Sequence, residues 1–145
     1  MSKHWLSGLL RARQLQEDSA KQRLAGAQRE SQHARGRVRH HVDRIESLVA
    51  ADAVDNAPAF TAAAAALQAA AATHSAALRA VDDADQFVSL RHGELTAAAR
   101  ARRTVEEMHE QHLAEIRARH AAAAMREMDE IAARVHRDGT AGARS

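Results

Sequence analysis

Small and apolar residues recur along the first third of the chain with the alternating steps of three and four that define a heptad repeat. Such spacing, when sustained over several heptads, is typical of a coiled coil. Counted from Leu10, the positions of this first seam are Leu10, Arg13, Glu17, Ala20, Leu24, Ala27, Ser31, Ala34, Val38, His41, Ile45 and Leu48. The pattern predicts a helix over about residues 3–52. Gly26 and Gly36 soften it in the middle, because each costs about 1 kcal/mol relative to alanine.

The chain has one proline, Pro58, which marks a predicted turn over residues 53–58. Proline disfavours helix in the residue before it and is tolerated in the first turn of a new helix. Asp55 or Asn56 can cap that helix, because both side chains accept hydrogen bonds from free N–H groups of a first turn. A second helical run is therefore predicted over about residues 59–138.

The second run is less regular than the first. Residues 59–92 are rich in alanine and Gly93 offers a break, so this part is either one helix or contains a kink or a short extra helix. Beyond it, a firmer apolar stripe consists of Leu95, Val105, Met108, Leu113, Ile116, Met128, Ile131 and Val135. Val105 and Ile116 are 11 residues apart, and such steps predict local unwinding of a heptad supercoil. Residues 139–145 are predicted to form a disordered tail.

Alanine dominates the composition, with 37 of the 145 residues, whereas only three residues are Phe or Trp. Alanine is the best helix former but buries little surface, so it makes a thin seam rather than a bulky core. Helices of this kind gain most of their stability by packing against a partner. We therefore expect an all-α fold, a long antiparallel two-helix coiled-coil hairpin that forms one domain over residues 1–138 and brings the chain ends together.

Several classes of chemistry find no support in the sequence. Cysteine is absent, so there is no disulfide framework or thiolate metal site. No stretch approaches the roughly 20 apolar residues that cross a bilayer, and no phosphate-binding loop or catalytic motif occurs. We expect a non-enzymatic, soluble cytoplasmic protein without a cofactor.

Histidine is plentiful, with ten residues, and it raises two hypotheses. Glu30–His33 and Glu106–His109 match the Glu-x-x-His element of di-iron helix bundles. Such a site also needs glutamates from other helices around a cavity, which a two-helix hairpin does not offer, so no metal site is predicted. His41 and His74 fall at seam positions. There they are either tolerated, partly exposed polar residues or groups whose protonation near pH 6 loosens the hairpin.

A basic stretch in the first helix consists of Arg35, Arg37, Arg39 and Arg44. Runs of this kind often contact phosphates. Here Asp43 and Glu46 interrupt it, and no aromatic residues interleave to stack on bases. A solvated face or a protein-docking patch is the preferred interpretation, and no nucleic-acid partner is expected.

Motifs near the two chain ends suggest a family. The start reads Trp5-Leu6-Ser7-Gly8-Leu9-Leu10-Arg11-Ala12-Arg13, an aromatic residue followed by leucines. The last part contains Arg102-Arg103-Thr104-Val105-Glu106-Glu107-Met108 and then Glu127-Met128-Asp129-Glu130-Ile131-Ala132. Together with the length and the single central break, these motifs resemble the flagellar FliJ proteins. The alanine-rich segment 61–77 has no counterpart in that pattern.

The resemblance implies a component of the flagellar type III export apparatus. Such a protein would be a stalk that couples the hexameric export ATPase to the export gate protein, and an escort for export chaperones. It would lie in the cytoplasm, held peripherally at the cytoplasmic face of the inner membrane by its partners. The alternative is a nucleoid- or filament-associated coiled-coil scaffold without an export function.

The resemblance also implies which residues contact the ATPase, at a tip formed by the paired chain ends. The apolar contacts would be Trp5, Leu6, Leu9, Leu10, Met128, Ile131 and Val135, and the charged contacts would be Arg11, Arg13 and Arg134. The alternative is that all of these are ordinary seam residues.

Overall fold

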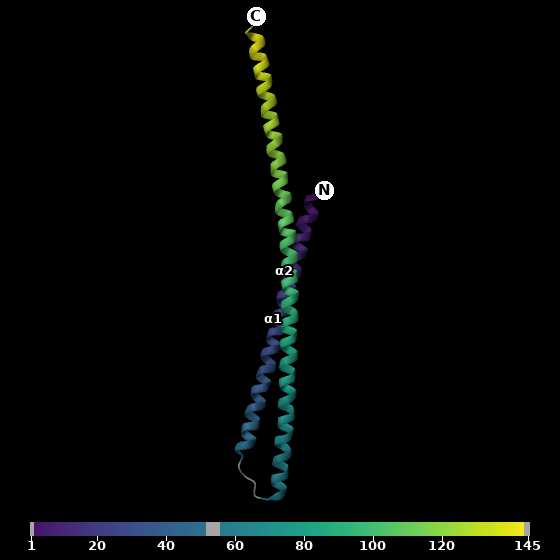
Figure 1. The fold of residues 1–145 in the computed structure, drawn as a ribbon, viewed down its shortest axis with the longest axis vertical. Coiled ribbons are helices and arrows are strands. Elements are labelled where there is room, and N and C mark those ends of the chain that lie inside the picture. The colour runs from purple at the N-terminus through teal and green to yellow at the C-terminus, as the bar shows by residue number, and fades with distance from the viewer. Residues whose placement is uncertain (1, 52–55, 144–145) are drawn as a thin grey trace. The chain divides into compact units, whose positions relative to one another are not determined.

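The computed structural model describes residues 2–51 and 56–143, without the side chains of residues 2 and 3. Helix α1 (Ser2–Ala50) and helix α2 (Ala57–Gly142) are its two elements. The helices run antiparallel, so the predicted all-α two-helix hairpin is confirmed (Figure 1). Residues 59–92 belong to one uninterrupted helix, and Gly93 lies inside it. The many alanines of this segment favour helix strongly enough to absorb the cost of one glycine.

Helix α2 begins as the sequence predicted. The Ala59 N–H donates to Oδ1 of Asn56 over 2.8 Å, and the Phe60 N–H donates to the Asn56 carbonyl over 3.0 Å. Asn56 is therefore the N-cap, and Pro58 occupies the first turn, where its missing N–H costs nothing. Asp55, the other capping candidate, lies outside the described residues, as do residues 53–54 of the predicted turn.

The end of α2 differs from the expectation. Helix continues to Gly142 where a disordered tail was predicted from residue 139. Near this end the Thr140 hydroxyl donates to the His136 carbonyl over 3.1 Å, and the Arg137 Nε–H donates to the Ala133 carbonyl over 3.3 Å. In both bonds a side chain donates to the carbonyl four residues earlier, which is the local pattern of a continuing helix. Residues 144–145 lie outside the described residues.

The chain divides into two compact units, residues 13–100 and a unit made of residues 1–12 and 101–145. In the unit of residues 13–100, the heptad prediction for α1 is confirmed, because every seam position from Arg13 to Leu48 is buried or partly buried. Ala20 and Ala34 are 1% and 0% exposed. Small side chains at these positions let the two helices approach closely.

A second heptad seam, on α2, faces that of α1. Its buried and partly buried positions alternate in steps of four and three: Ala70, His74, Ala77, Val81, Ala84, Val88, Arg91, Leu95 and Ala98. Only three of these nine, Val81, Val88 and Leu95, are larger aliphatic residues, so the apolar pattern of this seam is weak. Leu78 lies outside the seam and is 45% exposed, whereas Leu67, one heptad before His74, is in register with it but is 38% exposed.

Polar contacts between the helices fix the alignment of the two seams. The buried Ser31 hydroxyl donates to Oδ1 of Asp85 over 2.7 Å, and Arg35 donates to Oδ2 of the same carboxylate over 2.6 Å. Arg23 and Glu94 form an ion pair at 4.0 Å. A polar group at a seam position disfavours other registers, because a shift would leave it without a partner.

The unit of residues 1–12 and 101–145 has its own small core. Leu6 of α1 is 5% exposed and Val105 of α2 is 6% exposed. The buried positions of α2 keep the heptad spacing through Arg102, Val105, His109, His112 and Ile116. The predicted unwinding was therefore wrong here. The 11 residues from Val105 to Ile116 are one heptad plus four residues, and both ends are seam positions.

The chain ends do not meet. The N-terminal turns of α1 lie beside the middle of α2, and the last part of α2 continues beyond them (Figure 1). Every described side chain from Arg117 to Ala143 is exposed. The expectation of a single tip built from both ends was wrong. It assumed helices of similar length, whereas α1 has 49 residues and α2 has 86.

Candidate functional site

The exposed C-terminal part of α2, residues 117–143, carries an apolar stripe. Its members are Met125, Met128, Ile131 and Val135, which are 68%, 70%, 59% and 67% exposed. Their spacing of three and four residues places them on one face of the helix. An α-helix turns by about 100° per residue, so Met128 is rotated roughly 120° from the seam position Ile116. We call these four residues the C-terminal stripe.

Two ion pairs lie along this part of α2, one before the C-terminal stripe and one beside it. Arg119 lies 3.8 Å from Glu115, and Arg134 lies 3.7 Å from Glu130, both as pairs four residues apart. All four of these side chains are at least 65% exposed. Such surface pairs contribute little to stability. The charges are therefore free to exchange partners when another protein binds.

The predicted contact residues at the N-terminal end have different environments. Trp5 is 55% exposed and Arg11 is exposed, whereas Leu6 is buried and Leu9 and Leu10 are partly buried. The structure thus makes Leu6 a core residue. Trp5 and the C-terminal stripe remain exposed, but they do not form one patch, because the N-terminal turns lie beside the middle of α2.

Arg13 belongs to the other unit and is partly buried at its seam position. One of its terminal nitrogens, Nη1, donates to Oε1 of Gln16 over 3.0 Å. The environment of Arg13 is that of a seam residue, in agreement with the alternative reading of the terminal motif.

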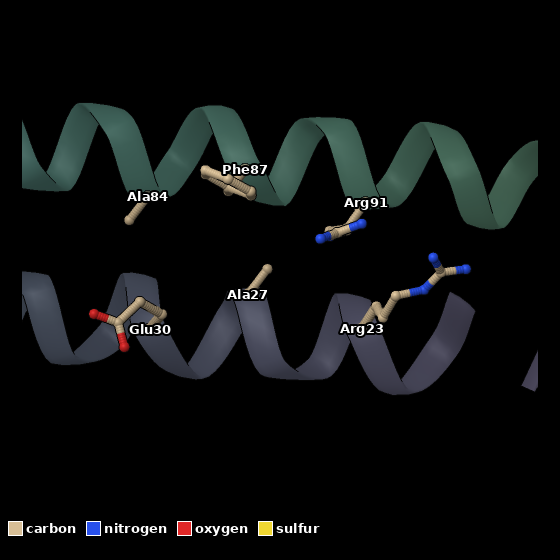
Figure 2. A pocket seen from close by; sticks show the side chains of 6 residues that line it. All are labelled: Arg23, Ala27, Glu30, Ala84, Phe87 and Arg91. Carbon is tan, nitrogen blue, oxygen red and sulfur yellow. The ribbon is translucent and has the colours of Figure 1, made fainter. Parts of the chain in front are cut away.

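A groove in the unit of residues 13–100 was missed at the sequence level. It has a volume of about 300 Å³ and lies between α1 and α2. Its lining residues are Arg23, Ala27, Glu30, Ala84, Phe87 and Arg91 (Figure 2). Ala27 of α1 and Ala84 of α2 point toward the gap between the helices, and the ring of Phe87 lies along α2 beside it. We call this feature the Phe87 groove. An aromatic residue beside two seam alanines is the sequence signal that could have revealed it.

The Phe87 groove is charged at one end. The guanidinium carbon of Arg91 lies 5.9 Å from the centroid of the Phe87 ring, a cation–π distance. Arg91 also donates to both carboxylate oxygens of Glu94, over 3.1 and 3.0 Å, and Arg23 lies 4.0 Å from the same carboxylate. Two cations therefore share one anion at this end. At the other end, Glu30 lies 3.4 Å from Arg37.

The Ser31–Asp85–Arg35 contact joins the two helices of that unit. The hydrogen bond from Ser31 lowers the pKa of Asp85 below its ordinary value of 3.8, and the charge and hydrogen bond of Arg35 act in the same direction. Desolvation raises the pKa and is second in size to the Ser31 hydrogen bond, but the lowering contributions together outweigh it. Asp85 is thereby held as a carboxylate that joins the two helices. Arg35 is engaged with it, so this residue of the basic stretch is part of the hairpin.

The sequence model of the flagellar FliJ protein family matches residues 2–140. The chain belongs to the flagellar FliJ family. Its role is accordingly related to flagellar protein export. Comparison with curated proteins and with solved structures gave no significant match.

Other features of this FliJ-family chain bear on its chemistry. Within residues 2–51 and 56–143, neither helix has a stretch long and apolar enough to cross a membrane. In the same part of the chain, no three or more His, Asp or Glu side chains are grouped to hold a metal ion. Glu30 and His33, one of the Glu-x-x-His pairs, are both exposed on α1.

The seam histidines are where the sequence placed them. His41 and His74 are both partly buried. Nδ1 of His74 is a buried nitrogen without a hydrogen-bond partner, and so is Nε2 of His112 in the other unit. These two buried nitrogens therefore add no hydrogen bond to the interfaces in which they lie.

Proposed function

We propose that this FliJ-family chain is a non-enzymatic stalk of the flagellar type III export apparatus, coupling the export ATPase hexamer to the export gate protein. We further propose that it escorts export chaperones and needs no cofactor. Its partners would hold it peripherally at the cytoplasmic face of the inner membrane. Membership of the family favours this role over that of a nucleoid- or filament-associated scaffold.

The observation that carries the stalk proposal is the C-terminal part of α2. Residues 117–142 form a helix of about 40 Å at 1.5 Å per residue, and the side chains of residues 117–143 are exposed. Isolated helices gain little stability from propensity alone, so an extended helix with an apolar stripe is suited to packing against another protein. The opening at the centre of a hexameric ATPase would accept one helix of this kind.

The C-terminal stripe supplies the binding energy in this proposal. Full burial of an aliphatic side chain is worth about 1.5–3 kcal/mol, and the four residues of the stripe are all more than half exposed. Arg134 and the neighbouring charged residues would form the rim of the interface, where charges steer association more than they add affinity. Leu6, which is buried, is excluded from direct contact. Trp5 remains a candidate contact because its side chain is exposed.

The test compares two double variants of the full chain. Met128→Ser with Ile131→Ser removes the centre of the C-terminal stripe, and Leu15→Ser with Val49→Ser is the matched control at sites 64% and 66% exposed. Binding to the purified export ATPase and stimulation of ATP hydrolysis are measured. We expect roughly a tenfold or greater loss of affinity for the stripe variant only, because a few central apolar residues usually carry most of the binding energy of an interface. Equal affinities for both variants would refute the proposed contact.

A further inference from the structure

The Phe87 groove has no part in the stalk proposal, and its composition is unusual for this chain. Phe87 is one of two phenylalanines and is 55% exposed, although it stands beside the seam. Across the gap from it, Ala27 is too short to cover its ring (Figure 2). The hairpin thus leaves a bulky aromatic residue next to a hollow of about 300 Å³ that its own side chains do not fill.

The shape of the groove fits a helix. Its walls are formed by residues 23, 27 and 30 of α1 and by residues 84, 87 and 91 of α2. In each wall the steps are three and four residues, so each wall is one stripe along a helix and runs for roughly 10 Å. A groove between two antiparallel helices is the place where a third helix packs in a bundle, with side chains at similar spacing.

Other modes of peptide recognition do not fit the same surface. Addition of a β-strand needs a free sheet edge, whereas the groove is walled by two helices whose backbone groups bond within each helix. Recognition of a proline-rich segment needs several aromatic side chains, and the groove has only Phe87. A helix that lays an apolar face into a groove is the remaining common mode.

The charges of the groove define the partner further. Arg23 and Arg91 lie together at one end and share the carboxylate of Glu94, so this end carries one more positive than negative group. The side chains of Arg23 and Arg91 are 50% and 28% exposed. A carboxylate of a bound partner would complete this cluster, and arginine and aromatic residues are the types most often found at energetic centres of interfaces.

We propose that the Phe87 groove binds an amphipathic α-helix of a partner protein. The helix inserts an aliphatic side chain between Phe87 and Ala27 and directs an acidic side chain toward Arg23 and Arg91. The bound helix covers the exposed ring of Phe87 and makes a local three-helix bundle. The site lies in the unit of residues 13–100, so it is a second interaction surface in addition to the C-terminal stripe.

The probe is a pair of fluorescein-labelled 21-residue helical peptides. Both carry leucines at steps of three and four, and they differ only in having Glu or Lys on either side of the leucines. Binding to the full chain is followed by fluorescence anisotropy. We expect saturable binding of the Glu peptide, and binding of the Lys peptide weaker by about tenfold, because each guanidinium favours a carboxylate. Equal binding of the two peptides, or no saturable binding, would overturn the proposal.

Variants of the full chain locate the binding. Phe87→Ala should weaken binding of the Glu peptide by roughly tenfold or more, whereas Phe60→Ala, a control at a site 62% exposed, should leave it unchanged. The Arg23→Glu, Arg91→Glu double variant should reverse the preference between the peptides. Circular dichroism is used to check that each variant keeps the helicity of the wild type. The double charge reversal tests the site independently of the Phe87 substitution.

One competing occupant is a second copy of this chain. Sedimentation velocity over a range of protein concentrations detects it. A dimer that dissociates in Phe87→Ala, but not in Phe60→Ala, would assign the groove to self-association and overturn the proposal. This test does not involve the C-terminal stripe, so the groove and the ATPase contact can fail separately.

Discussion

At the scale of single residues, Asp85 shows how a polar group can define a thin interface. Its carboxylate accepts hydrogen bonds from Ser31 and Arg35, both on the opposite helix. Alanine seams pack equally well in several registers, because all their side chains have the same size. A specific polar contact penalises every register but one. The lowered pKa of Asp85 means that its charged form stabilises the folded hairpin relative to the unfolded chain.

The first prediction concerns the pH dependence of this contact. The pKa of Asp85 is lower in the folded state, so its stabilising effect is present above about pH 4 and is lost as the pH falls through the folded pKa. Asp85→Asn should therefore melt at a lower temperature than the wild type at pH 7, and the difference should shrink as the pH falls through the folded pKa. Thermal unfolding by circular dichroism measures the difference, with the exposed Asp82→Asn as the control. A difference that persists unchanged at low pH would contradict the assignment.

The second prediction concerns Gly36. A Cβ added there meets nothing within 4 Å, and its backbone conformation is one that other residues adopt readily. Gly36→Ala should raise the free energy of unfolding by about 1 kcal/mol, because alanine is the better helix former. Urea unfolding measures the change. At Gly26 the nearest atom to an added Cβ is Nη2 of Arg29 at 3.9 Å, so Gly26→Ala should give a similar gain. A loss of stability in Gly36→Ala would disprove the expected tolerance.

At the scale of elements, the sequence predicted one seam well and the other poorly. The seam of α1 could be read because leucine, isoleucine and valine occur at regular heptad positions between its polar members. Six of the nine α2 seam positions are alanine, histidine or arginine, among them His74 and Arg91, whereas the apolar Leu78 lies outside the seam. Apolar residues alone therefore marked the buried face of this helix only weakly. The partner helix decides which face of an alanine-rich helix is buried, and that information is not local.

The third prediction tests how closely the helices pack. Ala34 is 0% exposed, so Ala34→Leu forces a larger side chain into the seam and should lower the free energy of unfolding by about 1–3 kcal/mol. The same change at the exposed Ala63 should have little effect, because leucine and alanine have similar helix propensities. Urea unfolding of the two variants gives the comparison. Equal stability would show that the helices are not in close contact at Ala34.

At the scale of the whole molecule, the lengths of the helices decide where partner surfaces lie. The sequence indicated the contact residues through a family resemblance, but it placed them in one tip. That placement failed because residues 59–92 continue as helix, which adds roughly 50 Å to α2 at 1.5 Å per residue. The Phe87 groove was missed for a related reason. A hollow between two helices depends on which alanines face each other, and this requires the register.

The last prediction separates the C-terminal part of α2 from the rest of the chain. A variant that ends at Arg117 lacks the C-terminal stripe but keeps the described core residues of both units, Leu6 and Val105 among them. Its free energy of unfolding should lie within about 0.5 kcal/mol of the wild type, because it loses only exposed side chains. Its affinity for the export ATPase should nevertheless fall as far as that of the Met128→Ser, Ile131→Ser variant, or further.

Urea unfolding and ATPase binding are measured on the same preparations of this truncated chain. If stability drops together with binding, residues 118–145 support the fold, and loss of affinity no longer identifies a contact surface. If both remain unchanged, the ATPase contact lies elsewhere. The proposal is supported only if the truncated chain keeps its stability and loses its affinity for the ATPase. That result would mean that the exposed helix serves to bind another protein and not to stabilise its own chain. The Glu peptide should still bind this variant through the Phe87 groove, since all six lining residues precede residue 117.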